Sequence, residues 1–142
     1  MRSVMFGRSG IAVALVGVLL AFGAACAPPP PGPPPTTGAT YRVEVAGEFF
    51  VLRATSPSVI DQLDDALATR RLGVVGGALR RGDGGFNAPH LWHLDPSTVY
   101  VADLAIELCD GRPTSDLDAD PDYWIDTVGS YCPWAARVVA RL

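Results

Sequence analysis

The feature that most constrains this chain is a cysteine, Cys26, placed between an apolar stretch and a run of prolines. Residues 11–22 are apolar and follow two positive residues, Arg2 and Arg8. A membrane-spanning helix needs about 20 apolar residues, so this stretch is too short to be one and is typical of an export signal. Seven prolines lie within residues 27–39, and they exclude helix and sheet there. Only the residues after this run are left to form a folded core.

The residues around Cys26 predict a lipoprotein signal peptide over residues 1–25. Ala24 and Ala25 are small enough for the extended backbone that lipoprotein processing requires. Two or more acyl chains on the cysteine would then anchor the protein stably to a membrane. The alternatives are ordinary cleavage beside Ala25 or Ala27, with release of a secreted protein, and retention in the cytoplasm.

The prolines predict a stiff tether over residues 26–39, beginning with the lipidated Cys26. A polyproline II segment rises by about 3.1 Å per residue, so this tether spans roughly 40 Å. Residues 40–142 then form a single globular domain of ordinary size. The expected location is extracytoplasmic, as a cell-membrane lipoprotein or otherwise as a secreted protein.

The negative net charge of the chain argues against nucleic acids as partners. Without the signal peptide the chain holds nine arginines against fifteen acidic residues, a net charge of −6. Basic residues are adjacent only at Arg70-Arg71 and Arg80-Arg81, and no basic stripe extends from either pair. Nucleic-acid binding is therefore not expected.

Two cysteines remain if Cys26 carries lipid, and their even number predicts a Cys109–Cys132 disulfide in an oxidising compartment. Closing this loop would stabilise the fold by roughly 3 kcal/mol in the chain-entropy model. The alternatives are two buried thiols or a pair of metal ligands, and two cysteines without close spacing make a poor metal site.

The hydrophobic pattern alternates between strand and helix periods. Tyr41, Val43 and Val45 alternate with polar residues, which is typical of a strand with one buried face. Ser56 and Pro57 favour a helix start, and apolar residues follow at helical spacing. Further strands are expected over residues 49–52, 72–79, 91–94, 98–108 and 134–142, and a second helix over 122–128. This order predicts an α+β fold: a small mixed or antiparallel sheet with two helices on one face and one disulfide.

One of these segments also permits a second interpretation. In the strand expected over residues 98–108, five apolar residues share one face: Tyr100, Ala102, Leu104, Ile106 and Leu108. Asp103 and Glu107 lie on the other face, but they are also four residues apart, as on a helix. Trp92, in an apolar run, and Trp134, just after Cys132, are expected to pack in the core.

No residue pattern indicates a cofactor or a metal. Alternating aspartates over residues 116–122 resemble the start of a calcium loop, but the glycine and the bidentate acid of an EF-hand are missing. His90 and His93 are too few for a zinc site. Among enzymes, the alternative is a small envelope hydrolase that uses acidic residues and histidine near Glu107, Asp110 and His93.

Three segments as a set resemble a known family. They are Asn87-Ala88-Pro89 leading into Trp92-His93-Leu94-Asp95-Pro96, then Ala105-Ile106-Glu107-Leu108-Cys109-Asp110-Gly111, and Cys132-Pro133-Trp134. They are similar to secreted domains grouped with the N-terminal region of an amoebal calmodulin-binding protein, over roughly residues 41–142. The resemblance implies a compact extracytoplasmic domain and no catalytic residues. The candidate ligand-contact residues taken from these motifs are Asn87, Trp92, His93, Asp95, Glu107, Asp110 and Trp134.

The expected function is a membrane-tethered binding or structural module of the bacterial cell envelope. Its partners would be the membrane, through the N-terminal lipid, and an envelope protein, peptide or glycan. Calmodulin is not expected as a partner, because calmodulin targets are basic amphipathic helices and the helix expected after Pro57 exposes three aspartates. Anchor, spacer and the lack of a catalytic constellation favour a module over the hydrolase.

We predict that Cys26 is the mature N-terminus and carries lipid. Intact-mass analysis of the protein from the membrane fraction should give the mass of residues 26–142 plus a diacylglyceryl group. A soluble product that begins at Ala27 or later would contradict this prediction.

Overall fold

The computed structural model describes residues 38–142. The expected signal peptide, the lipidated Cys26 and nearly all of the tether lie outside the described residues. Within the described part of the chain, no helix is long and apolar enough to cross a membrane.

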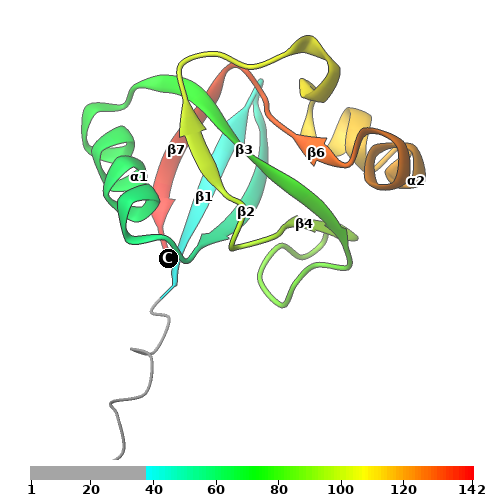
Figure 1. The fold of residues 1–142 in the computed structure, drawn as a ribbon, viewed down its shortest axis with the longest axis horizontal. Coiled ribbons are helices and arrows are strands. Elements are labelled where there is room, and N and C mark those ends of the chain that lie inside the picture. The colour runs from blue at the N-terminus through cyan, green and yellow to red at the C-terminus, as the bar shows by residue number, and fades with distance from the viewer. Residues whose placement is uncertain (1–37) are drawn as a thin grey trace, which may run out of the picture. The chain divides into compact units, whose positions relative to one another are not determined.

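Seven strands form one sheet in the order β2-β1-β7-β3-β4, with β5 and β6 also paired to β3 (Figure 1). The strands are β1 (Ala39–Val45), β2 (Glu48–Ala54), β3 (Leu72–Arg81), β4 (Trp92–Leu94), β5 (Tyr100–Ala102), β6 (Ser130–Tyr131) and β7 (Ala136–Arg141). The helical elements are α1 (Pro57–Thr69), α2 (Pro121–Tyr123) with the wide turn η3 (Trp124–Val128) directly after it, and the short turns η1 (Glu107–Cys109) and η2 (Pro113–Leu117). Every strand pair is antiparallel. The α+β class and the antiparallel form of the sheet are thus confirmed.

β1 and β2 form a hairpin whose register follows from the alternation of apolar and polar residues. Tyr41 pairs with Leu52 and Val43 with Phe50, and all four side chains are buried. The strands are joined by the two residues Ala46 and Gly47, whose φ angles are 50° and 84°. Positive φ at both central residues is the turn geometry that matches the twist of two antiparallel strands.

Helix α1 begins at Pro57 and packs mainly against β7 and β5 of the sheet. Its buried residues are Leu63 and Ala66. The Tyr41 hydroxyl donates a hydrogen bond to Asp64 at 2.8 Å, so α1 is fastened to β1 by a polar contact as well as by packing. The Ser56 side chain does not cap the helix, and its hydroxyl contacts that of Ser58 instead.

Strand β3 has partners along both of its edges. β7 pairs with Leu72 and Gly73 and β6 with Gly77 and Ala78, so these strands follow each other along one edge. β5 and β4 follow each other along the second edge, opposite residues 74–76 and 79–81. Figure 1 shows β3 running across the whole molecule between them.

The two faces of β3 belong to two different apolar clusters. Val75 lies in the main core, which also holds residues of α1 and, at its border, Trp124 and Ile125 of η3. Val74 lies in a small second cluster with Cys109 and Cys132. Neighbouring residues of a strand point to opposite faces, so the disulfide covers the face of β3 that the main core leaves free. The expected disulfide between Cys109 and Cys132 is present. Helix α1 and the turn η3 both pack on the main core.

The strand expected over residues 98–108 is much shorter than its pattern predicts. Only Tyr100–Ala102 pairs with β3, and the chain then leaves the edge of the sheet to reach Cys132 on its reverse side. The residues directly after Ala102 therefore have no partner strand in the sheet. Four of the five apolar side chains expected on one face are exposed to solvent: Tyr100, and beyond the paired segment Leu104, Ile106 and Leu108.

An aromatic cluster forms the centre of the main core. The Phe50 ring lies 5.7 Å from that of Trp92 and 5.5 Å from that of Tyr131, measured between centroids. Trp92 is 1% exposed, which confirms its expected burial. The same expectation for Trp134 is wrong, because 46% of that residue is exposed. Trp134 lies where the chain turns from β6 to β7, and its ring lies outside the main core.

We predict that the two tryptophans differ sharply in their contribution to stability. Trp92→Ala should lower the free energy of unfolding by about 3 to 5 kcal/mol, because it removes a buried indole from the core. Trp134→Ala, the matched control, should cost about 1 kcal/mol or less. Urea denaturation under oxidising conditions measures the free energy of unfolding of both variants. Equal losses of stability would contradict the conclusion that Trp92 is buried in the core and Trp134 is not.

Candidate functional site

The candidate residues from the sequence motifs separate into two groups. Asn87, Trp92, His93 and Asp95 lie on or beside β4, and the other three lie near the disulfide: Glu107, Asp110 and Trp134. β4 pairs with the last residues of β3, whereas the disulfide covers Val74 near its start. The structure therefore brings the residues together within each group but does not join the two groups.

Asn87 is a fully buried link between two strands. Its side-chain oxygen accepts a hydrogen bond from the backbone N–H of Val51 at 2.6 Å. Its side-chain nitrogen donates to the carbonyl oxygen of Trp92 at 2.8 Å. Asn87 thus ties β2 to β4, and because both polar atoms are occupied it is a structural residue of the fold.

Asp118, which is not among the candidate residues from the motifs, completes the polar contacts around Trp92. One carboxylate oxygen accepts a hydrogen bond from the Trp92 indole N–H at 2.9 Å. The other lies 2.7 Å from Nδ1 of His90. His90 is buried, and its Nε2 lies 2.9 Å from the carbonyl oxygen of Phe49. These groups satisfy one another, so none is free to act on a substrate.

His93 and Asp95 also have local partners. Nδ1 of His93 lies 2.7 Å from the carbonyl oxygen of Gly82. Asp95 accepts hydrogen bonds from the Ser97 hydroxyl and backbone N–H, and with Arg80 nearby these bonds lower the pKa of its carboxyl group. A carboxylate held ionised in this way stabilises a turn and is poorly suited to donate a proton.

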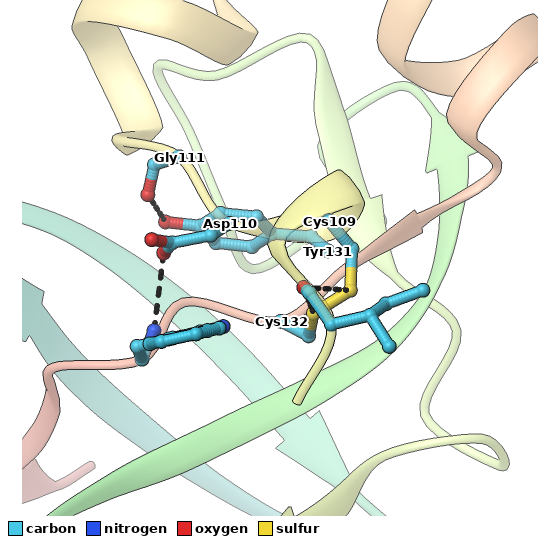
Figure 2. The surroundings of a disulfide bond; sticks show 7 residues. Cys109, Asp110, Gly111, Tyr131 and Cys132 are labelled. Atoms are coloured by element: carbon cyan, nitrogen blue, oxygen red, sulfur yellow. Dashed lines mark hydrogen bonds between the residues drawn. A yellow bond between two sulfur atoms is a disulfide. The ribbon is translucent and has the colours of Figure 1, made fainter. Parts of the chain in front are cut away.

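The disulfide organises the second group (Figure 2). The Cα atoms of Cys109 and Cys132 lie 5.1 Å apart, and the backbone N–H of Cys132 donates to the carbonyl oxygen of Cys109 at 2.8 Å. The carbonyl oxygen of Ile106 lies 3.5 Å from the Cys109 sulfur. The loop before η1 is therefore held directly against the bridge.

Two further hydrogen bonds fix the chain after the bridge. Asp110 accepts a hydrogen bond from the backbone N–H of Trp134 at 3.1 Å, and the Tyr131 hydroxyl donates to the carbonyl oxygen of Gly111 at 2.9 Å, as Figure 2 shows. Burial raises the pKa of Tyr131, so the hydroxyl stays protonated and remains a donor. A Cβ on Gly111 would lie 2.8 Å from the Trp124 ring, so only glycine fits there without a shift.

Beside the disulfide lies a patch that we call the distal apolar surface. It consists of four large exposed side chains: Leu104 (88% exposed), Ile106 (67%), Leu108 (62%) and Trp134 (46%). Leu104 and Trp134 line a small hollow of about 80 Å³ together with Val74 and Ala105. Other large apolar side chains are exposed elsewhere on the domain, among them Leu72 and Leu91, but here three lie within five residues of one loop. Several exposed apolar side chains in one place are typical of a contact surface for a partner.

The distal apolar surface lies far from the point where the chain enters the domain. A shallow depression joins Trp134 and Asp110 to Val45 and Ala46, at the end of β1. Ala39, at the start of β1, is six residues away along an extended strand, which is about 20 Å. Figure 1 shows the loop after β5 and the start of β1 at opposite ends of the molecule.

The signal for this surface is present in the sequence. The alternation of Leu104, Ile106 and Leu108 predicts a buried strand face, but alternation alone does not distinguish a face covered by core from one covered by a partner. Glu107 and Asp110 are both exposed. Within residues 38–142 there is no group of three His, Cys, Asp or Glu side chains that could hold a metal ion.

Comparison with known proteins gives one match. The model of the family described as the BP-74 N-terminal domain matches residues 37–142, which is most of the chain. This confirms the resemblance that the three motifs indicated. No curated protein and no solved structure matches the chain.

We predict that the disulfide stabilises the domain by about 3 kcal/mol, the entropy of closing a loop of this size in the unfolded chain. Cys109→Ser with Cys132→Ser should lower the free energy of unfolding by this amount. A reducing agent should lower the free energy of unfolding of the parent protein to the value of the double variant, and should leave that of the double variant unchanged. If reductant has no effect on the parent, the bridge does not contribute as predicted.

Proposed function

We propose that this chain, which belongs to the BP-74 N-terminal domain family, is a tethered binding module of the bacterial cell envelope. Lipid on Cys26 would hold it to the membrane, and the distal apolar surface would contact a partner. One observation carries the proposal: the loop after β5 exposes large apolar side chains, and this loop lies at the end of the domain opposite to the start of β1 (Figure 1).

The exposed side chains are difficult to explain without a partner. Leu104, Ile106 and Leu108 lie within five residues, and each exposes more than half of its surface. Exposed leucines are common singly, but a cluster of them indicates an interaction site. The disulfide and the contact of the Ile106 carbonyl with it hold the C-terminal end of this loop against the domain, which limits the conformational entropy lost on binding.

The arrangement of the titratable groups favours binding over catalysis. Asp118, His90 and Trp92 satisfy one another inside the fold. His93 and Asp95 lie at the other end of β3 from Glu107 and Asp110. A hydrolase needs its acid and base on either side of one substrate bond, and this separation does not offer such a place.

The disulfide and the position of the surface both support a location outside the cytoplasm. Disulfides persist in oxidising compartments and are rare in the cytosol. A tether of about 40 Å followed by a domain with β1 about 20 Å long would hold the distal apolar surface well away from the lipid headgroups. Such a distance suits contact with a partner in the envelope.

We predict that the distal apolar surface is required to retain a partner in living cells. The full chain would be crosslinked in the envelope and purified, as the parent, as Leu104→Ser with Leu108→Ser, and as Leu91→Ser. Leu91 is a matched control because it is 73% exposed but lies just before β4, away from the surface. Crosslinked partners should be kept by the parent and the control and lost by the double variant.

The outcome that contradicts the proposal is equally clear. If the double variant retains every partner that the parent retains, while its melting temperature and membrane location are unchanged, this surface is not a binding site. Release of the parent from the membrane fraction would contradict the anchor at Cys26.

A further inference from the structure

We infer that the partner of the distal apolar surface is a protein segment that is basic as well as apolar. This inference rests on the proposed function and concerns the chemistry of the partner. It follows from three exposed acidic residues. Asp103 lines the hollow with Leu104 and Trp134, Asp110 accepts a hydrogen bond from the backbone N–H of Trp134, and Glu107 lies between Ile106 and Leu108 in the chain.

These carboxylates are accessible and only weakly neutralised by the protein itself. The Asp103 side chain is 92% exposed, and Arg71 lies 3.9 Å away with its own side chain half exposed. A pair of this kind contributes little, so most of the charge remains available. Residues 103–110, which carry the apolar side chains, include no lysine or arginine. Arg112 follows them and lines the depression beside Asp110 and Trp134, but its guanidinium lies 3.5 Å from Asp116.

A lipid surface fits this chemistry poorly. Glu107 lies between Ile106 and Leu108 in the chain, so inserting the two apolar residues into hydrocarbon would bring the carboxylate with them. A charged side chain in a bilayer costs several kcal/mol. Anionic headgroups would also repel Asp103 and Asp110.

A second copy of the chain fits this surface poorly because of the same charges. In a two-fold dimer the same patch lies on both subunits, so the acids of one copy would face those of the other. Like charges brought together at an interface cost several kcal/mol. A segment with positive charges around apolar anchors avoids this cost and pairs with the acids instead.

Arginine suits the rim of such a segment better than lysine. Its guanidinium donates two parallel hydrogen bonds to one carboxylate, and Asp103 and Glu107 present exposed carboxylates. The hollow between Leu104 and Trp134, of about 80 Å³, exceeds the ~30 Å³ of a water molecule. It therefore has room for the branched end of an aliphatic side chain of the partner.

The inference is tested with synthetic peptides and with residues 26–142 produced directly, without the signal peptide and with Cys26→Ser in place of the lipidated residue. The probes are a fluorescent amphipathic peptide of leucine and arginine, about 18 residues long, and its match with glutamate in place of every arginine. Fluorescence anisotropy should show binding of the arginine peptide only. Its affinity should fall at least about tenfold between roughly 0.05 M and 0.3 M salt, since exposed charges are screened.

Four variants identify the surface that binds. Asp103→Asn with Glu107→Gln should weaken binding of the arginine peptide about three- to tenfold, as expected for two exposed ion pairs. Leu104→Ser with Leu108→Ser should weaken it more than about tenfold, because apolar contact area is lost. The matched controls are Asp61→Asn with Asp65→Asn, two exposed acids of α1, and Leu91→Ser, and both should bind like the parent.

The results that overturn the inference differ from those that overturn the proposed function. A basic partner is ruled out if the glutamate peptide binds equally well, or if the α1 control loses as much affinity as Asp103→Asn with Glu107→Gln. It is also ruled out if the surface instead binds phosphatidylcholine vesicles or forms a dimer. If cellular crosslinking needs Leu104 and Leu108 but not Asp103 and Glu107, the binding module stands and its partner is not basic.

Discussion

The structure depends on one strand, β3 (Leu72–Arg81), whose two edges and two faces are all occupied. Four strands share its edges, and two apolar clusters cover its faces. The glycines of β3 make this crowding possible. At Gly76 a Cβ would lie 2.6 Å from the Tyr100 ring and 2.8 Å from the carbonyl oxygen of Tyr131, so a larger residue would separate the partners on both edges. A glycine is normally unfavourable within a strand, and here the close approach that it allows compensates.

Buried polar groups join the β1–β2 hairpin to the rest of the sheet. Asn87 connects Val51 to Trp92, and His90 connects Phe49 to Asp118. Every buried side-chain polar atom within residues 38–142 has a hydrogen-bond partner. Such contacts contribute about 1 kcal/mol each when made and cost more when one partner is removed. They specify one arrangement of the strands, and for the same reason they are not free for chemistry.

The side of β3 that carries the disulfide differs in character from the main core. There the bridge takes the place of a large apolar cluster and holds a loop whose leucines face solvent. A loop that is fixed at one end by the bridge and exposes apolar residues beside acidic ones is suited to bind a partner, because the bridge limits the entropy lost on binding and the charges select among partners. The three residues of the sequence motifs near the bridge, Glu107, Asp110 and Trp134, lie in or beside this surface.

Much of the fold could be predicted from local patterns. The β1–β2 alternation, the start of α1 at Pro57 and the parity of Cys109 and Cys132 were sufficient, because strand period, helix start and disulfide pairing depend on residue type and spacing. The separation of His93 from Glu107 could not be predicted, since it depends on which parts of β3 their segments contact.

By itself the sequence determined most of the strands, the long helix α1, the fold class and the bridge. Only the tertiary structure decided whether the apolar residues after β5 are buried or exposed, because burial depends on what covers a side chain. The period of two in Tyr100, Ala102, Leu104, Ile106 and Leu108 is the same whether a sheet or solvent lies opposite. After β5 the chain leaves one edge of β3 and crosses to Cys132, which follows β6 on the other edge. Leu104, Ile106 and Leu108 lie on this crossing and therefore outside the sheet. Only the tertiary structure therefore shows that an apparent strand face is an exposed surface.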